Sequence, residues 1–353
     1  MEMESLLSDY YDYNNDSDYN NETEEQVEEI FPQAHWILPT LYSIFFFFGL
    51  LGNALVIAVI SRRSSRRADI FILNLAVSDM LFVLTLPLWA SSLALGNYWP
   101  FGVHLCKTSG FTIAVTRCAS SLLMACMSVD RYLAVMGGQK MLLLRTKNCS
   151  LGACCTIWAV SVLSGVPALA FRQLNEENGA CVEPAKSSLI VGLKISTVLL
   201  TFVLPLIVVL FCYCCMARHL KKYFGRGKGT LKPRRGQSWL RIVTCVVAAY
   251  TFSWLPFNTL NSVAMAAQLN MDLPLLNAID QPLCAAAALA FANSCTNPII
   301  YFLLDAGFRR RAKMLIPRIF PACCADLLSP LNIQIIPAAT GSAESGSTYT
   351  GSC

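Results

Sequence analysis

Seven long apolar segments divide the chain, and shorter polar segments separate them. Each apolar segment holds about 20 or more residues, enough for a helix to cross the ~30 Å hydrocarbon core of a bilayer. They lack the period-two alternation of a membrane barrel, so only helices would satisfy their backbone hydrogen bonds in lipid. The pattern predicts an all-α membrane protein, a seven-transmembrane helix bundle with spans at 36–61, 70–95, 103–136, 149–170, 188–223, 236–268 and 275–303.

The composition agrees with a chain embedded in lipid. Of the 353 residues, 55% are hydrophobic and only 14% are charged, and the mean hydropathy is +0.50. A soluble globule of this composition would expose large apolar patches to water. The composition therefore excludes an ordinary soluble domain.

Basic residues mark one side of the predicted bundle. Residues 1–61 contain no Lys or Arg, whereas four arginines lie within residues 62–67 and further cations gather in 218–241 and 309–318. Because cytoplasmic loops carry an excess of Lys and Arg, we expect an extracellular N-terminus and a cytoplasmic C-terminus. The first residues lack a basic and apolar leader, so the first span is expected to act as its own signal-anchor.

Four regions follow from these patterns. We expect an acidic, disordered extracellular tail at 1–35, the transmembrane domain at 36–304, an amphipathic membrane-surface helix at 305–318, and a disordered cytoplasmic tail at 319–353. The short eighth helix suits the inner leaflet because apolar and basic side chains alternate along it. These are Phe308, Ala312, Leu315 and Ile316 on the apolar side, and Arg309, Arg310, Arg311 and Lys313 on the basic side.

Most of the 16 cysteines fall within spans or on the cytoplasmic side. Cys106 and Cys181 lie clearly outside, in the oxidising compartment, so we expect a disulfide between them. Cys284, near the outer end of the seventh span, is left undecided. The cysteines within the spans are expected to be small buried apolar side chains, at positions Cys118, Cys126, Cys154, Cys155, Cys212, Cys214, Cys215, Cys245 and Cys295.

One signature per span resembles the rhodopsin-like (class A) G-protein-coupled receptors, over residues ~36–320. In chain order the signatures are Gly52-Asn53, Leu75-Ala76-Val77-Ser78-Asp79, Cys106 with Asp130-Arg131-Tyr132, Trp158, Pro205 with Tyr213, Trp254-Leu255-Pro256, and Asn297-Pro298 with Tyr301. Within that family the chain resembles the peptide and chemokine receptor branch, near its orphan-type members. This second resemblance rests on Thr85-Leu86-Pro87-Leu88-Trp89, Trp99-Pro100-Phe101, Asp130 to Val135, and Phe291 to Cys295.

The chain departs from the chemokine receptor pattern in three places. The acidic tail has no cysteine for the second outer disulfide, and residues 283–288 have no acidic residue where chemokine receptors place a ligand-binding Glu. Gly137-Gly138 puts the helicity of the second cytoplasmic loop in doubt, because glycine disfavours helices.

The resemblance assigns a G-protein switch to the cytoplasmic ends of the third, fifth and seventh spans. Arg131 stays charged and carries five donors, so Asp130 can hold it at rest and release it toward the G protein. The alternative is a boundary arginine that reaches for the lipid headgroups. The predicted switch comprises Asp130, Arg131, Tyr132, Tyr213, Asn297, Pro298 and Tyr301.

A buried carboxylate lies in the middle of the second span, at Asp79. Such a group protonates or finds a cation and hydrogen-bond donors. The resemblance implies a sodium pocket around it, and a polar cluster without metal is the alternative. The expected ligands are Asp79, Ser120, Asn293, Ser294 and Asn297, with Asn53 beside them.

Two residues of the sixth span form the expected pivot. Pro256 removes a helix hydrogen bond and can bend the span. The resemblance makes Trp254 a packing toggle next to the ligand cavity, whereas a plain core tryptophan is the alternative.

Cations in the extracellular half of the predicted bundle indicate which kind of ligand it binds. Ile113 stands where amine receptors need an aspartate, and the seventh span has no lysine for retinal, so amine and opsin functions are excluded. Arg117 and Lys194 are expensive in a membrane unless they meet an anion. We expect them to pair with a peptide carboxylate, or else Arg117 pairs with Asp79 or water. The candidate ligand contacts are Trp89, Ile113, Arg117, Lys194, Trp254 and Asp280.

The tails carry candidate modification sites. Residues 1–30 hold eleven Asp or Glu and no cation, a field that would attract basic proteins, although a solvated disordered tail would have the same composition. Cys323 and Cys324 follow the eighth helix and are palmitoylation candidates, with ordinary thiols as the alternative. In the acidic tail, sulfation is expected at Tyr10, Tyr11, Tyr13 and Tyr19, and glycosylation at Asn15 and Asn21.

Together these features predict a plasma-membrane receptor for a peptide or small basic, chemokine-like protein, signalling through a heterotrimeric G protein of the inhibitory class. Arrestin, receptor kinases and membrane lipid are the other expected partners, and nucleic acid is not. An atypical scavenging receptor that internalises ligand without G-protein activation is the alternative. Repeated halves typical of transporters are missing from the sequence, and no nucleophile and base pair indicates an enzyme.

Overall fold

The computed structural model describes residues 34–62, 67–136, 146–176, 178–183, 188–224, 235–270 and 273–319. Residues Met1–Arg309 form one compact unit and Arg310–Cys353 a second. The predicted sulfation, glycosylation and palmitoylation sites, and Gly137-Gly138, lie outside the described residues.

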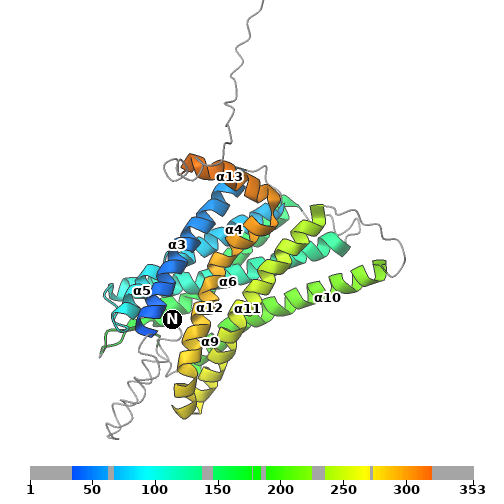
Figure 1. Cartoon of the computed structure of the whole chain (residues 1–353). Helices are drawn as coiled ribbons and strands as arrows, with labels where there is room; N and C mark the ends of the chain where they lie inside the picture. Colours follow the sequence, from blue (N-terminus) through cyan, green and yellow to red (C-terminus); the bar gives the residue numbers. More distant parts are fainter. Residues whose placement is uncertain are drawn as a thin grey trace, which may run out of the picture. The chain divides into compact units, whose positions relative to one another are not determined.

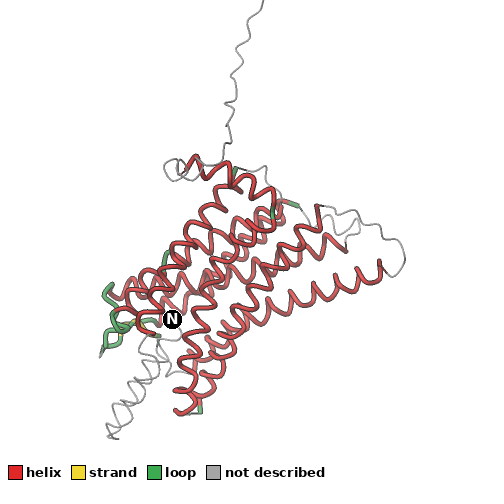
Figure 2. Tube along the Cα trace, viewed as in Figure 1, coloured by secondary structure: helices red, strands yellow, loops and turns green. Residues whose placement is uncertain are grey.

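The described chain is almost entirely helical (Figures 1 and 2). Seven of its helical stretches are long and apolar enough to cross a membrane, which confirms the predicted seven spans. The helices are α3 (Ala34–Ser61), α4 (Arg67–Val83), α5 (Leu86–Ala94), α6 (Gly102–Met136), α8 (Lys147–Phe171), α9 (Ser188–Val198), the π-helix η1 (Leu199–Val203), α10 (Leu204–Phe224), α11 (Arg235–Leu269), α12 (Leu273–Leu304) and α13 (Ala306–Ile319). The last of these is the further helix that the sequence predicted after the seventh span.

Two of the spans are interrupted near prolines. The second, predicted as one helix, breaks into α4 and α5 just before Pro87, and the Thr85 hydroxyl donates to the Phe82 carbonyl at 2.7 Å in the break. The fifth contains η1 directly before Pro205. Proline has no N–H and cannot close the bond to the carbonyl four residues earlier, so the backbone finds another arrangement at these points.

Helix α6 lies at the centre of the bundle and packs against α4, α8, α10 and α11. Its most apolar stretch is 67% buried, whereas the corresponding stretches of α3 and α8 are 28% buried. On α3 the outward-facing Phe47, Phe48 and Leu51 are each more than half exposed. An aromatic and aliphatic face of this kind matches lipid, so α3 and α8 lie at the periphery of the bundle and present much of their surface to lipid.

A disulfide and a short hairpin define one end of the bundle, here called the disulfide end. The predicted bond between Cys106 and Cys181 is confirmed. It ties the start of α6 to the antiparallel pair β1 (Gln173–Leu174) and β2 (Cys181–Val182), in which Leu174 lies opposite Cys181. Because α6 runs from this disulfide toward Arg131, the opposite end of the bundle is here called the Arg131 end.

The other described cysteines are only partly as expected. Cys118, Cys154 and Cys212 are buried, and Cys284 is not in a disulfide within the described residues. The prediction was wrong for Cys155 and Cys214, which are exposed on the bundle surface. In lipid an outward-facing thiol meets an apolar solvent, so apolar character alone does not place a residue inside a membrane bundle.

Close contact between α3 and α12 requires a glycine at position 52. A Cβ atom there would lie 2.9 Å from both Cβ and Cγ of the Pro298 ring, which is rigid. We expect Gly52→Ala to destabilise the fold by about 1–3 kcal/mol, the usual cost of overpacking. Thermal unfolding of the purified receptor in detergent measures this.

Gly152→Ala is the matched control for this substitution. Gly152 also lies within a helix, but a Cβ atom there would have nothing within 4 Å. Because alanine favours helix by about 1 kcal/mol over glycine, the control should unfold at the same or a higher temperature. Equal unfolding temperatures for the two variants would show that the contact with Pro298 is not tight.

Candidate functional site

Three polar groups of residues lie along the axis of the bundle: cations toward the disulfide end, a cluster around Asp79 in the middle, and an ion pair at the Arg131 end. Each contains residues of α6, whose most apolar stretch has the largest buried share among the described spans. Polar groups inside a membrane bundle are costly and usually functional. These three groups are therefore the candidate sites.

Arg117 lies where α6, η1 and α11 meet. Its Nη2 nitrogen donates to the Thr201 hydroxyl at 3.4 Å, and its guanidinium carbon is 5.7 Å from the centroid of the Trp254 ring. A cation over an aromatic ring at this distance is attracted by the ring quadrupole. The structure thus brings the predicted contacts Arg117 and Trp254 together and places Asp79 in a separate cluster.

A hydrogen bond to the Thr201 carbonyl joins η1 to α11. Pro205 has no N–H, and Thr201 lies four residues before it, so the usual helical donor to the Thr201 carbonyl is missing. The buried Tyr250 hydroxyl of α11 donates to that carbonyl instead, at 2.9 Å. Thr201 therefore links α11 through its carbonyl and α6 through its hydroxyl.

We expect Tyr250→Phe to lower the stability of the receptor by about 1–3 kcal/mol, because the buried Thr201 carbonyl would lose the Tyr250 donor. The ring and its packing remain, so only the hydroxyl is tested. Thermal unfolding of purified protein gives the result. Tyr98→Phe, which removes a hydroxyl from an exposed tyrosine, should leave the unfolding temperature unchanged; an equal loss in both variants would contradict the role of the Tyr250 bond.

Lys194 and Ile113 are also buried near this end of the bundle. Lys194, on α9, is 6% exposed, and Ile113, on α6, is likewise 6% exposed. Lys194 lies seven residues before Thr201, which is roughly 10 Å further toward the disulfide end along a helix. Asp280, the remaining predicted contact, belongs to α12, but its side chain lies outside the described part of the structure.

Sequence reasoning missed Arg172, the first residue after α8. Its side chain is only 4% exposed, its guanidinium carbon lies 5.4 Å from the centroid of the Trp89 ring, and its Nη1 nitrogen donates to Cys181 Sγ at 3.6 Å. Gly110 on α6 leaves room for it, since a Cβ atom there would collide with the Arg172 side chain. An arginine at the end of an apolar segment usually extends to the headgroups, so its position gave no signal of burial.

Trp89, a predicted ligand contact, forms an aromatic wall at the disulfide end. It is almost fully buried, and its ring centroid lies 4.8 Å from that of Trp99. Trp99 in turn packs edge-on against Phe101 at 5.3 Å and donates its indole N–H to the Gly102 carbonyl. Arg172 covers the Trp89 ring, so this wall carries a positive charge.

The middle cluster surrounds Asp79, which is buried on α4. Asn297 of α12 donates its amide to Asp79 Oδ2 at 2.8 Å, so the structure brings these two predicted residues together. Asn53 donates to the Ser294 carbonyl, and Ser120 donates to Ser78 Oγ, both at 2.9 Å. The predicted residues of the middle cluster, with Asn293 also buried, are thus all inside the bundle.

At the Arg131 end, Arg131 is paired with its neighbour. Its Nη2 nitrogen lies 2.7 Å from Asp130 Oδ2, and both side chains are largely buried. Tyr132 turns away, and its ring lies 6.2 Å from that of Phe211 on α10. Opposite charges this close attract each other, so Asp130 occupies part of the Arg131 fork.

The two tyrosines expected to support Arg131 lie on α10 and α12. Tyr213 is half-buried, and Tyr301 is 4% exposed with its ring 6.3 Å from that of Phe308. The Tyr301 hydroxyl is buried without a hydrogen-bond partner among the described residues. A buried hydroxyl without a partner is costly, so the predicted role of this tyrosine in a switch stays a prediction with a hydroxyl available for a new contact.

The protein is thus a seven-helix membrane bundle with an ion-paired arginine at one end and buried cations at the other. The chain belongs to the 7 transmembrane receptor (rhodopsin family), which it matches over residues 52–301. It is 44% identical over 291 residues to the probable G-protein coupled receptor 25 of Mus musculus, a match that covers 80% of this chain and 78% of the relative.

Two further relatives cover still more of the chain. The G-protein coupled receptor 15 of Mus musculus is 36% identical over 311 residues, 86% of this chain and 84% of the relative. Apelin receptor A of Danio rerio is 35% identical over 335 residues, 90% of this chain and 91% of the relative. The predicted family is therefore confirmed, together with its peptide receptor branch and orphan-type members, and the chain is a multi-pass membrane receptor and not an enzyme.

Proposed function

We propose that this receptor binds a peptide or a small basic, chemokine-like protein at the disulfide end and signals through a heterotrimeric G protein at the Arg131 end. One observation supports this most: Arg117 lies inside the bundle between Thr201 and Trp254. A guanidinium at this depth is strongly stabilised by an incoming carboxylate, with which it can form two parallel hydrogen bonds. A peptide's terminal carboxylate, or an acidic side chain, is the chemistry that fits.

Lys194 and Arg172 extend the positive charge from Arg117 toward the disulfide end. Trp89 and Trp99 add an aromatic wall. Apolar walls with a few placed charges are typical of sites that bind most of a ligand's surface. We assign the end of the ligand to this region.

The body of the ligand is expected to be basic. Residues 1–30 carry eleven Asp or Glu and no cation, so the remainder of the chain has a formal charge of +16, from 27 minus 11. Sulfation of Tyr10, Tyr11, Tyr13 or Tyr19 would strengthen the negative field of this tail. Such a field attracts a basic partner and raises its association rate, while the carboxylate end enters the bundle.

The proposal includes the orientation of the receptor in the membrane. We place the N-terminus and the disulfide end outside the cell, in the plasma membrane, and the Arg131 end in the cytosol, because the cations of 62–67, 218–241 and 309–318 all belong to the latter side. The G protein is proposed to be of the inhibitory class. Receptor kinases and arrestin would act on the serines and threonines of the C-terminal tail.

A sodium ion in the middle cluster is part of this proposal. Sodium is bound by oxygen ligands, and the Asp79 carboxylate is buried there. The amide oxygens of Asn53, Asn293 and Asn297 are buried without hydrogen-bond partners among the described residues, which suits them to a cation. Asp79, Ser120, Asn293, Ser294 and Asn297 would hold the ion and so stabilise the resting arrangement.

Paired peptides test the ligand assignment. A library of basic peptides and chemokine-like proteins is applied as free acids and as C-terminal amides, and G-protein dissociation is followed for inhibitory, stimulatory and phospholipase-linked classes. We expect an active sequence to lose at least about tenfold in potency as the amide, because the buried cations lose their anion. Equal potency of acid and amide in every active pair would overturn the terminal carboxylate assignment.

A further inference from the structure

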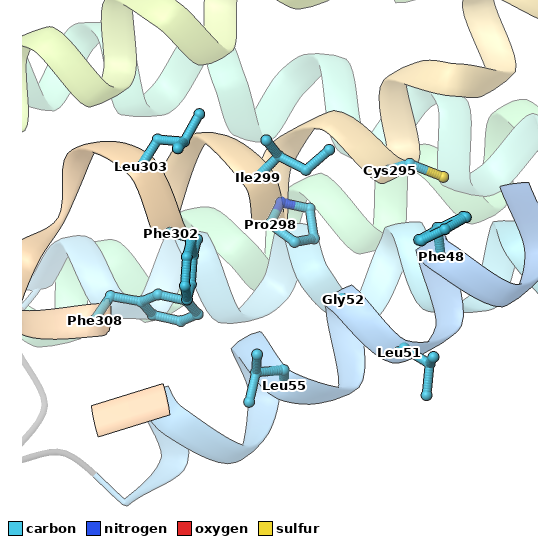
Figure 3. Close-up of a pocket in the computed structure, with 10 residues that line it drawn as sticks. All are labelled: Phe48, Leu51, Gly52, Leu55, Cys295, Pro298, Ile299, Phe302, Leu303 and Phe308. Atoms are coloured by element: carbon cyan, nitrogen blue, oxygen red, sulfur yellow. The ribbon is translucent and has the colours of Figure 1, made fainter. Parts of the chain in front are cut away.

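A groove of about 330 Å³ opens between α3 and α12 on the lipid-facing side of the bundle (Figure 3). Gly52 and Pro298 form its floor, and Phe48 and Phe308 stand at its two ends. Phe48, Leu51 and Ile299 on its rim are 69%, 56% and 56% exposed. The lining is apolar, so in a membrane the groove accepts hydrocarbon.

The groove has the length of one leaflet and not of the whole bilayer. It begins at Phe48, near the middle of the span Trp36–Ser61, and follows α3 to Leu55, toward the Arg131 end. Seven helical residues cover roughly 10 Å, which is most of one leaflet of a ~30 Å hydrocarbon core. A single acyl chain that enters from the Arg131 end matches this length.

A fixed cation stands at the headgroup end of the groove. Arg309 directly follows the lining residue Phe308, and its Nη1 nitrogen donates to the carbonyls of Phe302 and Leu303 at 3.3 and 3.1 Å. These bonds hold the half-buried guanidinium against the end of α12. Arginine carries five donors in all, and among the described residues only Nη1 of Arg309 is bonded, so its Nε and Nη2 donors can bind an anion.

We propose that this groove is a binding site for an anionic phospholipid, with one acyl chain between Phe48 and Phe308 and the phosphate on Arg309. Charge complementarity identifies the headgroup, because a guanidinium matches a phosphate in geometry and charge, and the cation of a choline headgroup would offset that attraction in a neutral lipid. A sterol would bring only a neutral hydroxyl to Arg309. A second copy of the chain would pack along both leaflets, whereas the groove covers one.

The site adjoins the segment that the switch uses. Pro298 forms the floor of the groove, and Phe308 packs against Tyr301 with ring centroids 6.3 Å apart. A bound chain therefore contacts the outer side of the Asn297 to Tyr301 segment. Lipid binding itself does not depend on the identity of the receptor's ligand, so its test is independent of the proposed function.

Binding is measured on the purified full-length receptor in a neutral detergent. Phosphatidylserine and phosphatidylcholine with the same palmitoyl and oleoyl chains are titrated separately, and bound lipid is counted by native mass spectrometry. We expect phosphatidylserine to bind at least tenfold more tightly. Arg309→Gln should reduce its affinity to that of phosphatidylcholine, and Ile299→Trp, which fills the groove, should weaken both lipids at least tenfold.

Two matched variants distinguish lipid binding in the groove from general effects of surface charge and side-chain size. Arg62→Gln removes an exposed cation at the end of α3, and Leu163→Trp enlarges a side chain on the exposed face of α8, 70% exposed. Neither should change lipid affinity. If Arg309→Gln lowers the unfolding temperature without lipid, its weaker lipid binding could come from a loss of stability. The Ile299→Trp variant then provides the test of the groove.

Three results would overturn the proposal. These are equal affinity of the wild type for the two phospholipids, equal losses in Arg309→Gln and Arg62→Gln, and displacement of phosphatidylserine by cholesterol or by a second copy of the receptor. The first would leave no role for the net charge of the headgroup, and the second would show an effect of surface charge alone. The third would assign the groove to another occupant.

Discussion

Cells that express the Arg117→Ala receptor are expected to need at least about 30-fold more peptide agonist for the same response as the wild type. The substitution removes the cation between Thr201 and Trp254 and leaves the ligand's carboxylate buried without a partner. Removing one member of a buried, hydrogen-bonded charge pair costs about 2–5 kcal/mol, and each 1.4 kcal/mol is a factor of ten. Dose-response curves at matched surface expression give the shift.

Arg117→Lys is the control for this prediction. Lysine keeps the positive charge but has no planar fork for a carboxylate, so we expect an intermediate loss of potency. The free acid should lose potency in both variants, whereas the C-terminal amide should be affected much less. An unchanged response of Arg117→Ala to the free acid would contradict the role of Arg117 in ligand binding.

The second large effect is expected from Cys181→Ser, which opens the disulfide to Cys106. The bond joins residues 75 apart in sequence, and a link across a loop of this length contributes roughly 4 kcal/mol by constraining the unfolded chain. Its loss also removes the sulfur beside Arg172, which loosens the covering of Trp89. We expect a much lower unfolding temperature and little receptor at the cell surface.

Cys284→Ser separates disulfide loss from cysteine replacement in general. Cys284 is half-buried and, within the part of the chain that the structure describes, forms no disulfide. Its variant should reach the surface and unfold close to the wild type. Similar surface expression of Cys181→Ser, Cys284→Ser and the wild type would show that the disulfide contributes little to folding.

Sequence reasoning succeeded where the membrane limits the possibilities. A stretch such as 103–136 has to be a helix in lipid, and two outer cysteines in an oxidising compartment have few other partners, so the spans and the disulfide were predicted correctly. The position of Arg131 beside Asp130 in sequence also made their contact easy to expect.

Features that depend on contacts between helices were not predictable in the same way. The link from Tyr250 to the Thr201 carbonyl depends on η1 and on the placement of α11. The burial of Arg172 depends on the space at Gly110 and on the Trp89 ring. Hydropathy reports the preference for lipid or water but not which face of a helix meets a neighbour, which is why Cys155 and Cys214 were misplaced.

The most direct test of the central claim measures G-protein dissociation in cells that express the wild type or Arg131→Ala at equal surface levels, with ligand uptake followed in parallel. We predict an agonist response in the wild type that disappears in Arg131→Ala while ligand binding persists. Binding and uptake without G-protein dissociation in the wild type would contradict the signalling function and would identify a scavenging receptor.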